Sequence, residues 1–147
     1  MRALGFAAFA LVALLVPTSQ SAAPPITCPD ACTIGATSEG YLPPVVVVTE
    51  GALVSWEAID GTPHANTDAG LSVDPCMFVD IPGGEVSEPI AFEILDGELR
   101  VRDDLGPNET TTACANAVAL PNGGFAISYF CVLHPQLMRG ALVVQPA

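Results

Sequence analysis

Glycine and proline interrupt this chain so often that no long helix fits between them. The 147 residues include 13 glycines and 14 prolines, and the apolar runs between them are short and rich in β-branched residues. Such runs, bounded by turn-forming residues, are typical of strands, and many short strands without long helices indicate a sandwich. We therefore predict an all-β, Greek-key β-sandwich. The expected strands are 45–48, 53–56, 90–95, 99–102, 125–130 and 140–144.

Two longer stretches between these runs lack a clear strand pattern. Residues 66–89 and 103–123 are expected to be irregular insertions, and 112–120 could form a short helix. Half of all residues are hydrophobic, which is enough to build the packed core of one domain.

The first residues are typical of a targeting segment rather than of a folded domain. Arg2 precedes an apolar run over 3–16, which is too short for a comfortable transmembrane helix, and Pro17 ends that run. We expect a signal peptide over 1–23 and a single domain over 24–147. The mature protein would then be extracytoplasmic: periplasmic, at the cell surface or secreted. An uncleaved N-terminal anchor remains the alternative.

The chain contains five cysteines, and an odd number in an exported protein leaves one thiol that needs an explanation. Four of them can form two disulfides in an oxidising compartment, and three pairings exist for any four. We expect Cys28–Cys32 and Cys76–Cys114, although the sequence alone leaves the connectivity open. Cys131 would then be the free thiol.

The charge of the chain limits its possible partners. Sixteen acidic residues stand against four arginines and no lysine, which gives a formal net charge of −12. This balance argues against nucleic acid and anionic membranes as partners, because both would repel the protein. We expect a monomer without stable membrane insertion after signal cleavage. Its expected partner is a redox protein that carries a basic docking patch. Solubility alone is the competing explanation of the acidic residues.

One short segment carries three side chains that bind soft metals. Cys131, His134 and Met138 lie within eight residues, and the only other histidine of the chain is His64, in a loop after an expected strand. Two histidines, one thiolate and a weak axial methionine are the ligand set of blue-copper electron-transfer sites. Zinc is the alternative metal, but it prefers a closed tetrahedral site, and only one thiolate is expected to be available.

The sequence around these residues resembles that of the cupredoxins, in particular the plastocyanin, amicyanin, pseudoazurin and halocyanin type. The family pattern is a Val-x-Trp strand, a loop with a histidine, and later an aromatic-x-Cys-x-x-His segment that ends in Met-x-Gly and an apolar strand. Residues 54–56 and His64 match the first part, and 129–144 match the second. The resemblance covers the chain from about Tyr41 onward. It implies a cupredoxin-like sandwich that binds one type 1 copper ion.

The same resemblance assigns roles to single residues. It implies that His64, Cys131, His134 and Met138 bind the copper. Three residues separate His134 from Met138, whereas two or four are expected in relatives, so Gln136 remains an alternative axial ligand.

The resemblance also concerns the surroundings of the ligands. Asn66 or Ala65 is expected to support Cys131 through a hydrogen bond. Electrons are expected to pass at the edge of His134 through an apolar surface, for which ordinary packing is the alternative explanation. The apolar neighbours in question are Leu133, Pro135 and Leu137.

The ligand set predicts that the protein transfers single electrons between redox partners by cycling copper between Cu(II) and Cu(I). A copper carrier or buffer outside the cytoplasm would use the same ligands without a redox partner, and it remains the alternative. A metal-free interaction module is a third hypothesis, against which the complete ligand set argues. The sequence shows no catalytic triad, carboxylate pair or phosphate-binding loop, so we do not expect an enzyme.

Overall fold

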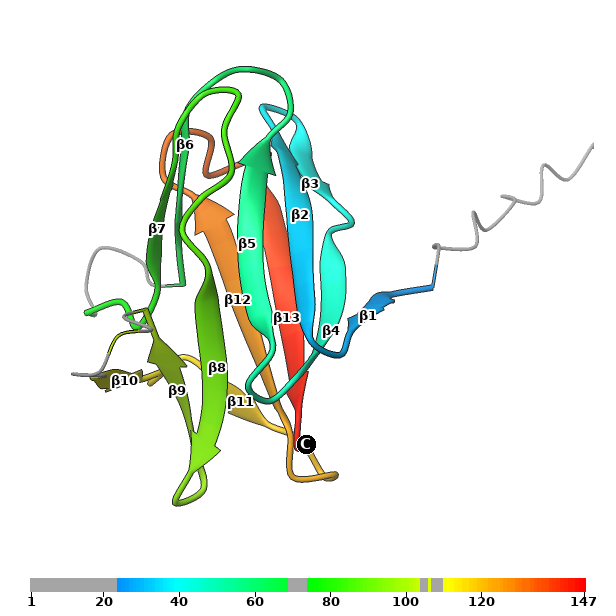
Figure 1. The fold of residues 1–147 in the computed structure, drawn as a ribbon, viewed down its shortest axis with the longest axis vertical. Helices are drawn as coiled ribbons and strands as arrows, with labels where there is room; N and C mark the ends of the chain where they lie inside the picture. Colours follow the sequence, from blue (N-terminus) through cyan, green and yellow to red (C-terminus); the bar gives the residue numbers. More distant parts are fainter. Residues whose placement is uncertain (1–23, 69–73, 104–105, 107–109) are drawn as a thin grey trace, which may run out of the picture.

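Two β-sheets face each other and enclose the core between them (Figure 1). The computed structural model describes residues 24–68, 74–103, 106 and 110–147. Among these residues, no helix is long and apolar enough to span a membrane. The expected signal peptide over 1–23 lies outside the described residues and stays a prediction. The expected all-β sandwich is confirmed.

Each sheet is a path of hydrogen-bonded strands taken from distant parts of the chain. The first sheet has the order β1 (Ile26–Cys28), β4 (Val45–Thr49), β13 (Arg139–Gln145), β12 (Phe125–Cys131), β6 (His64–Thr67) and β7 (Phe78–Ile81), and β11 (Val118–Ala119) also pairs with β12. The second has the order β10 (Thr111–Ala113), β9 (Glu98–Arg102), β8 (Ile90–Leu95), β5 (Leu53–Ala58), β2 (Ala31–Thr37) and β3 (Gly40–Leu42).

The core is formed by the side chains that point from each sheet toward the other. Successive side chains of a strand point to opposite faces, so every second residue of β12 faces the other sheet. The residues of β12 buried in this way are Phe125, Ile127, Tyr129 and Cys131. Trp56 of β5 is fully buried opposite them, and its ring contacts that of Tyr129 edge-on at a centroid distance of 5.5 Å.

Both expected disulfides are confirmed, and Cys131 is the free, buried cysteine. Cys28–Cys32 joins β1 to β2 and so ties the first strands of the two sheets together. Cys76–Cys114 closes a separation of 38 residues between the segment before β7 and the end of β10. A loop of this length stabilises the fold by about 4 kcal/mol through the reduced entropy of the unfolded chain.

The short helix that 112–120 could form is absent, and that expectation was wrong. Thr111–Ala113 instead forms β10, which pairs with the edge of β9, and Val118–Ala119 forms β11, which pairs with β12. Open sheet edges offer unpaired backbone groups, and pairing with them outweighs a weak local preference for helix.

The expectation of irregular structure over 66–89 was wrong in part. Thr67 continues β6, and Phe78–Ile81 forms β7, which pairs with β6 in antiparallel register from His64↔Ile81 to Thr67↔Phe78. The sequence analysis also missed β1, β2 and β3. β1 and β3 are short edge strands, and in β2 only Ile34 and Ala36 are buried, so the three strands show little apolar alternation. The Cys28–Cys32 disulfide and the parallel pairing of β2 with β5 hold β1 and β2 in place.

We expect Gly140→Ala to destabilise the fold by about 1–3 kcal/mol, as overpacking in a dense core does. Gly140 pairs with Tyr129 across β12 and β13, and a Cβ at Gly140 would lie 2.6 Å from the Tyr129 hydroxyl oxygen. Urea unfolding of the variant measures the change in free energy. The control is Ser128→Ala, an exposed position on β12, the strand of Tyr129, which should change stability by less than about 0.5 kcal/mol. Equal midpoints for the two variants would contradict this packing.

Candidate metal centre

Antiparallel pairing of β6 with β12 brings the two most distant candidate ligands together. His64 is the first residue of β6, and Cys131 is the last residue of β12. The register pairs Cys131 with Asn66, two residues beyond His64. The turn between β12 and β13, which carries His134, lies at the same end of the sandwich (Figure 1). Residues 67 positions apart in the chain therefore meet at one end of the first sheet.

The three predicted donors form a compact cluster. The Sγ atom of Cys131 lies 3.9 Å from Nδ1 of His64 and 3.9 Å from Nδ1 of His134. One ligand atom from each residue lies within 4.8 Å of the others. Cys131 and His64 are buried, whereas His134 is partly exposed. The cluster is thus closed toward the core and open to solvent only at His134.

The spacing of the donors fits one metal ion. An imidazole nitrogen and a thiolate bound to the same ion through bonds of about 2.1 and 2.3 Å, at about 120°, lie about 3.8 Å apart. Both observed sulfur–nitrogen distances are 3.9 Å. Cys131 and the two histidines can therefore bind a common ion with little rearrangement.

Backbone hydrogen bonds hold the turn that carries His134 and Met138. The His134 N–H donates to the Cys131 carbonyl at 3.2 Å, and the Met138 N–H donates to the His134 carbonyl at 2.9 Å. The Cys131 N–H in turn donates to the Met138 carbonyl at 3.1 Å. Met138 is fully buried, whereas Gln136 is exposed. Burial favours Met138 over Gln136 as the fourth ligand.

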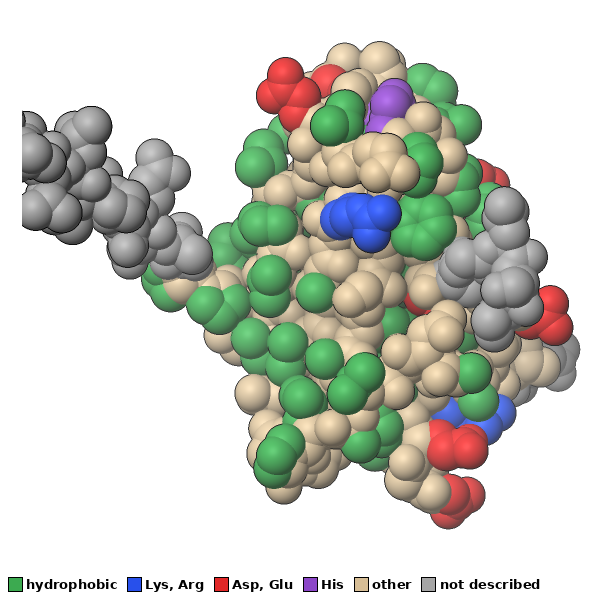
Figure 2. Space-filling model, turned by 180° about the vertical axis from the view of Figure 1, so that it is seen from behind, with side chains coloured by type: hydrophobic (Ala, Val, Ile, Leu, Met, Phe, Trp, Pro, Cys, Tyr) green, Lys and Arg blue, Asp and Glu red, His purple; other side chains and the backbone are tan. Residues whose placement is uncertain are grey.

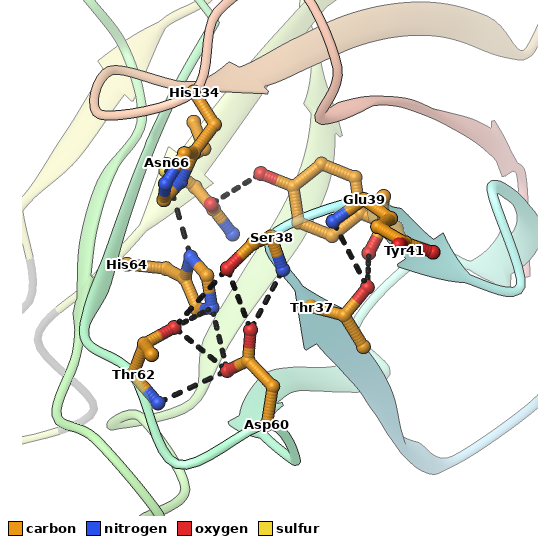
Figure 3. Close-up of polar contacts among 11 residues, drawn as sticks. Thr37, Ser38, Glu39, Tyr41, Asp60, Thr62, His64, Asn66 and His134 are labelled. Carbon is orange, nitrogen blue, oxygen red and sulfur yellow. Dashed lines mark hydrogen bonds and ion pairs between the residues drawn. The ribbon is translucent and has the colours of Figure 1, made fainter.

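The ring of His64 is held from the side opposite the cluster. Its Nε2 atom lies 3.1 Å from Oδ1 of Asp60 and 3.2 Å from Oγ1 of Thr62 (Figure 3). Partial desolvation by itself would raise the pKa of Asp60. Hydrogen bonds from Thr62, His64 and Ser38 outweigh it and hold that pKa well below its usual range, so the carboxylate is charged. A charged carboxylate beside Nε2 leaves Nδ1 of His64 to face Cys131.

Three aromatic side chains form the wall behind the cluster. The rings of Tyr41 and Tyr129 lie 4.7 Å apart, and Trp56 Nε1–H donates to the Tyr129 hydroxyl at 3.2 Å. The Tyr41 hydroxyl donates to Oδ1 of Asn66. Burial raises the pKa of both tyrosines, so both remain neutral. The wall excludes water from the protein side of Cys131.

The predicted neighbours of Cys131 lie beside it through their backbones. The Val132 N–H donates to the Ala65 carbonyl at 2.9 Å, and Asn66 is the ladder partner of Cys131. Nδ2 of Asn66 is buried and has no hydrogen-bond partner among the residues that the structure describes. Support of the Cys131 sulfur by either residue stays a prediction.

The surface around His134 is apolar. Leu133 is 57% exposed and Leu137 is 65% exposed, and Pro135 is exposed between them. Figure 2 shows histidine atoms at the surface of this end, among hydrophobic side chains. These residues therefore face solvent rather than pack in the core, and the passage of electrons at this surface stays a prediction.

Sequence reasoning missed Asp60 and Tyr41 as part of this site. A local signal for Asp60 exists, since Asp-Gly-Thr is typical of a turn in which the aspartate accepts hydrogen bonds from the residue two positions on. Asp60 also precedes His64 by four residues. Tyr41 gives no such signal, because β3 meets the cluster only through the fold.

The chain matches no protein-family model and no curated protein sequence. Among solved structures it is similar to an oxidised amicyanin variant, with 20% identity over 78% of this chain and 82% of amicyanin and a TM-score of 0.43. It is also similar to pseudoazurin from Hyphomicrobium denitrificans, with 11% identity over 78% and 74% of the two chains and a TM-score of 0.41.

A third similar structure is the copper-containing nitrite reductase from Thermus scotoductus SA-01. The identity is 14%, and the match covers 82% of this chain but 22% of the reductase, with a TM-score of 0.40. Amicyanin and pseudoazurin are cupredoxins, the family that the sequence resembles. Identities and TM-scores this low transfer no property from those proteins, so the function of this chain has to be inferred from its own side chains.

Proposed function

We propose that this protein binds one copper ion through His64, Cys131, His134 and Met138 and transfers single electrons. The observation that carries the proposal is the cluster of one buried thiol and two imidazoles, with both sulfur–nitrogen distances at 3.9 Å. A thiolate with two imidazoles and a weak thioether is the ligand set of type 1 copper. The bound ion would supply the Cu(II)/Cu(I) couple.

Copper fits this cluster better than zinc does. Structural zinc sites are closed tetrahedra, commonly with two or more thiolates. Here the other four cysteines are consumed in disulfides, so Cys131 is the single thiol that can bind. Met138, the buried candidate for the fourth position, offers a soft thioether that suits copper.

The residues around the proposed copper ion hold its ligands rigidly and leave one ligand accessible to a partner. Small structural change between oxidation states favours fast electron transfer, and ligands on paired strands are held more firmly than ligands on loops alone. His64 and Cys131 lie at the ends of the paired strands β6 and β12, and four backbone hydrogen bonds close the turn around His134. The partly exposed edge of His134 within its apolar surface gives a partner a short route to the ligands.

The setting of this function is also part of the proposal. Two disulfides are typical of an oxidising compartment, which agrees with an exported protein. The net charge of −12 suits a redox partner with a basic docking patch. We propose a monomeric electron carrier rather than an enzyme.

A visible spectrum of the Cu(II)-loaded mature chain tests copper binding. We expect an intense thiolate-to-copper charge-transfer band, because Cys131 is the only free thiol among the described residues. Cys131→Ser should abolish this band, and Ser128→Ala, an exposed change on the same strand, should leave it intact. A band that survives Cys131→Ser would show that the assigned site is wrong, and the lack of any band in the unchanged protein would remove the basis of the proposal.

The fourth ligand is tested by comparing Met138→Leu with Gln136→Ala. Loss of a weak donor to Cu(II) favours Cu(I), so Met138→Leu should raise the reduction potential and alter the visible spectrum. Gln136 is exposed, and its replacement should leave both unchanged. The measurements are cyclic voltammetry and absorption of the copper-loaded variants. If only Gln136→Ala changes them, glutamine is the axial ligand.

Electron exchange separates an electron carrier from a copper carrier. We expect rapid, reversible reduction of the copper-loaded protein, and Leu137→Glu should slow electron self-exchange about tenfold because it places like charges in the contact surface. Leu95→Glu, also at an exposed leucine but in the last residue of β8 at the far end of the sandwich, is the matched control and should have no effect. Slow oxidation with tight retention of Cu(I) would instead favour a copper carrier or buffer.

A further inference from the structure

We propose that Asp60 is a positioning residue for the metal centre: its carboxylate selects the tautomer of His64 and places a negative charge behind that ligand. The carboxylate selects this tautomer already in the metal-free chain. Its consequence for the metal rests on the proposed copper function.

The carboxylate of Asp60 is fixed by hydrogen bonds to both oxygens (Figure 3). Its Oδ1 accepts from the Thr62 N–H at 3.0 Å and from the Thr62 hydroxyl at 2.8 Å. Its Oδ2 accepts from the Ser38 N–H at 2.7 Å and from the Ser38 hydroxyl at 2.9 Å. Asp60 thus links the turn after β2 to the loop between β5 and β6, and its position does not depend on His64.

The neighbours of Nε2 determine where the proton of the His64 ring resides. Nε2 lies 3.1 Å from Oδ1 of Asp60, which can only accept a hydrogen bond. The second neighbour, Oγ1 of Thr62 at 3.2 Å, already donates its proton to Asp60 and therefore presents lone pairs to the ring. Both contacts require a proton on Nε2. The lone pair of a neutral His64 is then on Nδ1, the atom that faces Cys131 at 3.9 Å.

The two histidines of the candidate centre differ in whether a carboxylate contacts the ring. Within the described part of the chain, no carboxylate contacts His134, whose ring is partly exposed. His64 is buried and has a charged carboxylate on its outer nitrogen. A carboxylate on the outer N–H of a ligating imidazole raises its basicity. His64 is therefore the stronger nitrogen donor, and its carboxylate favours the ion of higher charge.

The effect on the metal is a preference for Cu(II) over Cu(I). The carboxylate attracts a dication more strongly than a monocation, and it does so through a ligand that it also orients. Its side chain is 22% exposed, so solvent weakens the effect. We expect removal of the charge to lower the ratio of Cu(II) to Cu(I) affinity about tenfold, which corresponds to a rise of about 59 mV in the one-electron potential.

The test compares Asp60→Asn with Glu39→Gln. Both variants remove one negative charge near the same turn, but Glu39 is exposed and does not hydrogen-bond to His64. Asp60→Ala is the second variant, because it removes the acceptor without introducing an amide. Circular dichroism verifies that each variant is folded.

The first readout is the tautomer of His64 in the metal-free protein, measured by nitrogen-15 NMR of the ring. We expect a single tautomer with Nε2 protonated in the unchanged protein and in Glu39→Gln, and a mixture in both Asp60 variants. The same single tautomer in all four proteins would overturn the positioning role, whether or not copper binds.

The second readout is the reduction potential of the copper-loaded proteins. It should rise in Asp60→Asn and stay constant in Glu39→Gln. Equal shifts in the two variants would overturn the specific role of Asp60 and leave only a general charge effect. A chain that binds no copper would contradict the proposed function, while the tautomer measurement would still decide the positioning role.

Discussion

The pairing of β6 with β12 is the interaction on which the rest of the site depends. It joins two short segments through the registers Phe130↔Thr67 and Cys131↔Asn66, and it places a histidine from one loop beside a thiol from another. A shift of one residue would turn the Cys131 side chain to the opposite face of the sheet. Further pairing of β6 with β7 and of β12 with β13 holds this register from both sides.

The packing behind Cys131, like the strand pairing, fixes the direction in which its side chain points. Tyr129 lies two residues earlier on the same face of β12, contacts Trp56 from the other sheet, and fits over Gly140 where a methyl group would collide with it. Tyr41 closes the side toward β3 and binds Asn66. Dense packing of this kind resists rearrangement of the side chains around Cys131.

A strand could be predicted from the sequence where its own residues show a strand pattern. The expected strands over 45–48, 53–56 and 90–95 match β4, β5 and β8 closely, because alternating or β-branched apolar residues mark them and turns bound them. The region 112–120 was expected to allow a short helix, yet it forms β10 and β11. Those strands exist because two sheet edges lie nearby, and no local pattern reveals the position of an edge.

For the candidate metal centre, the sequence by itself determined which side chains are available: one unpaired cysteine, two histidines and a methionine, all of them residue types that bind copper. The tertiary structure decided how they are arranged. It buried Met138 and exposed Gln136, and it placed the carboxylate of Asp60 on the outer nitrogen of His64. The physical reason is that donor chemistry belongs to each residue, whereas burial, tautomer and local charge arise only from neighbours that the fold brings into contact.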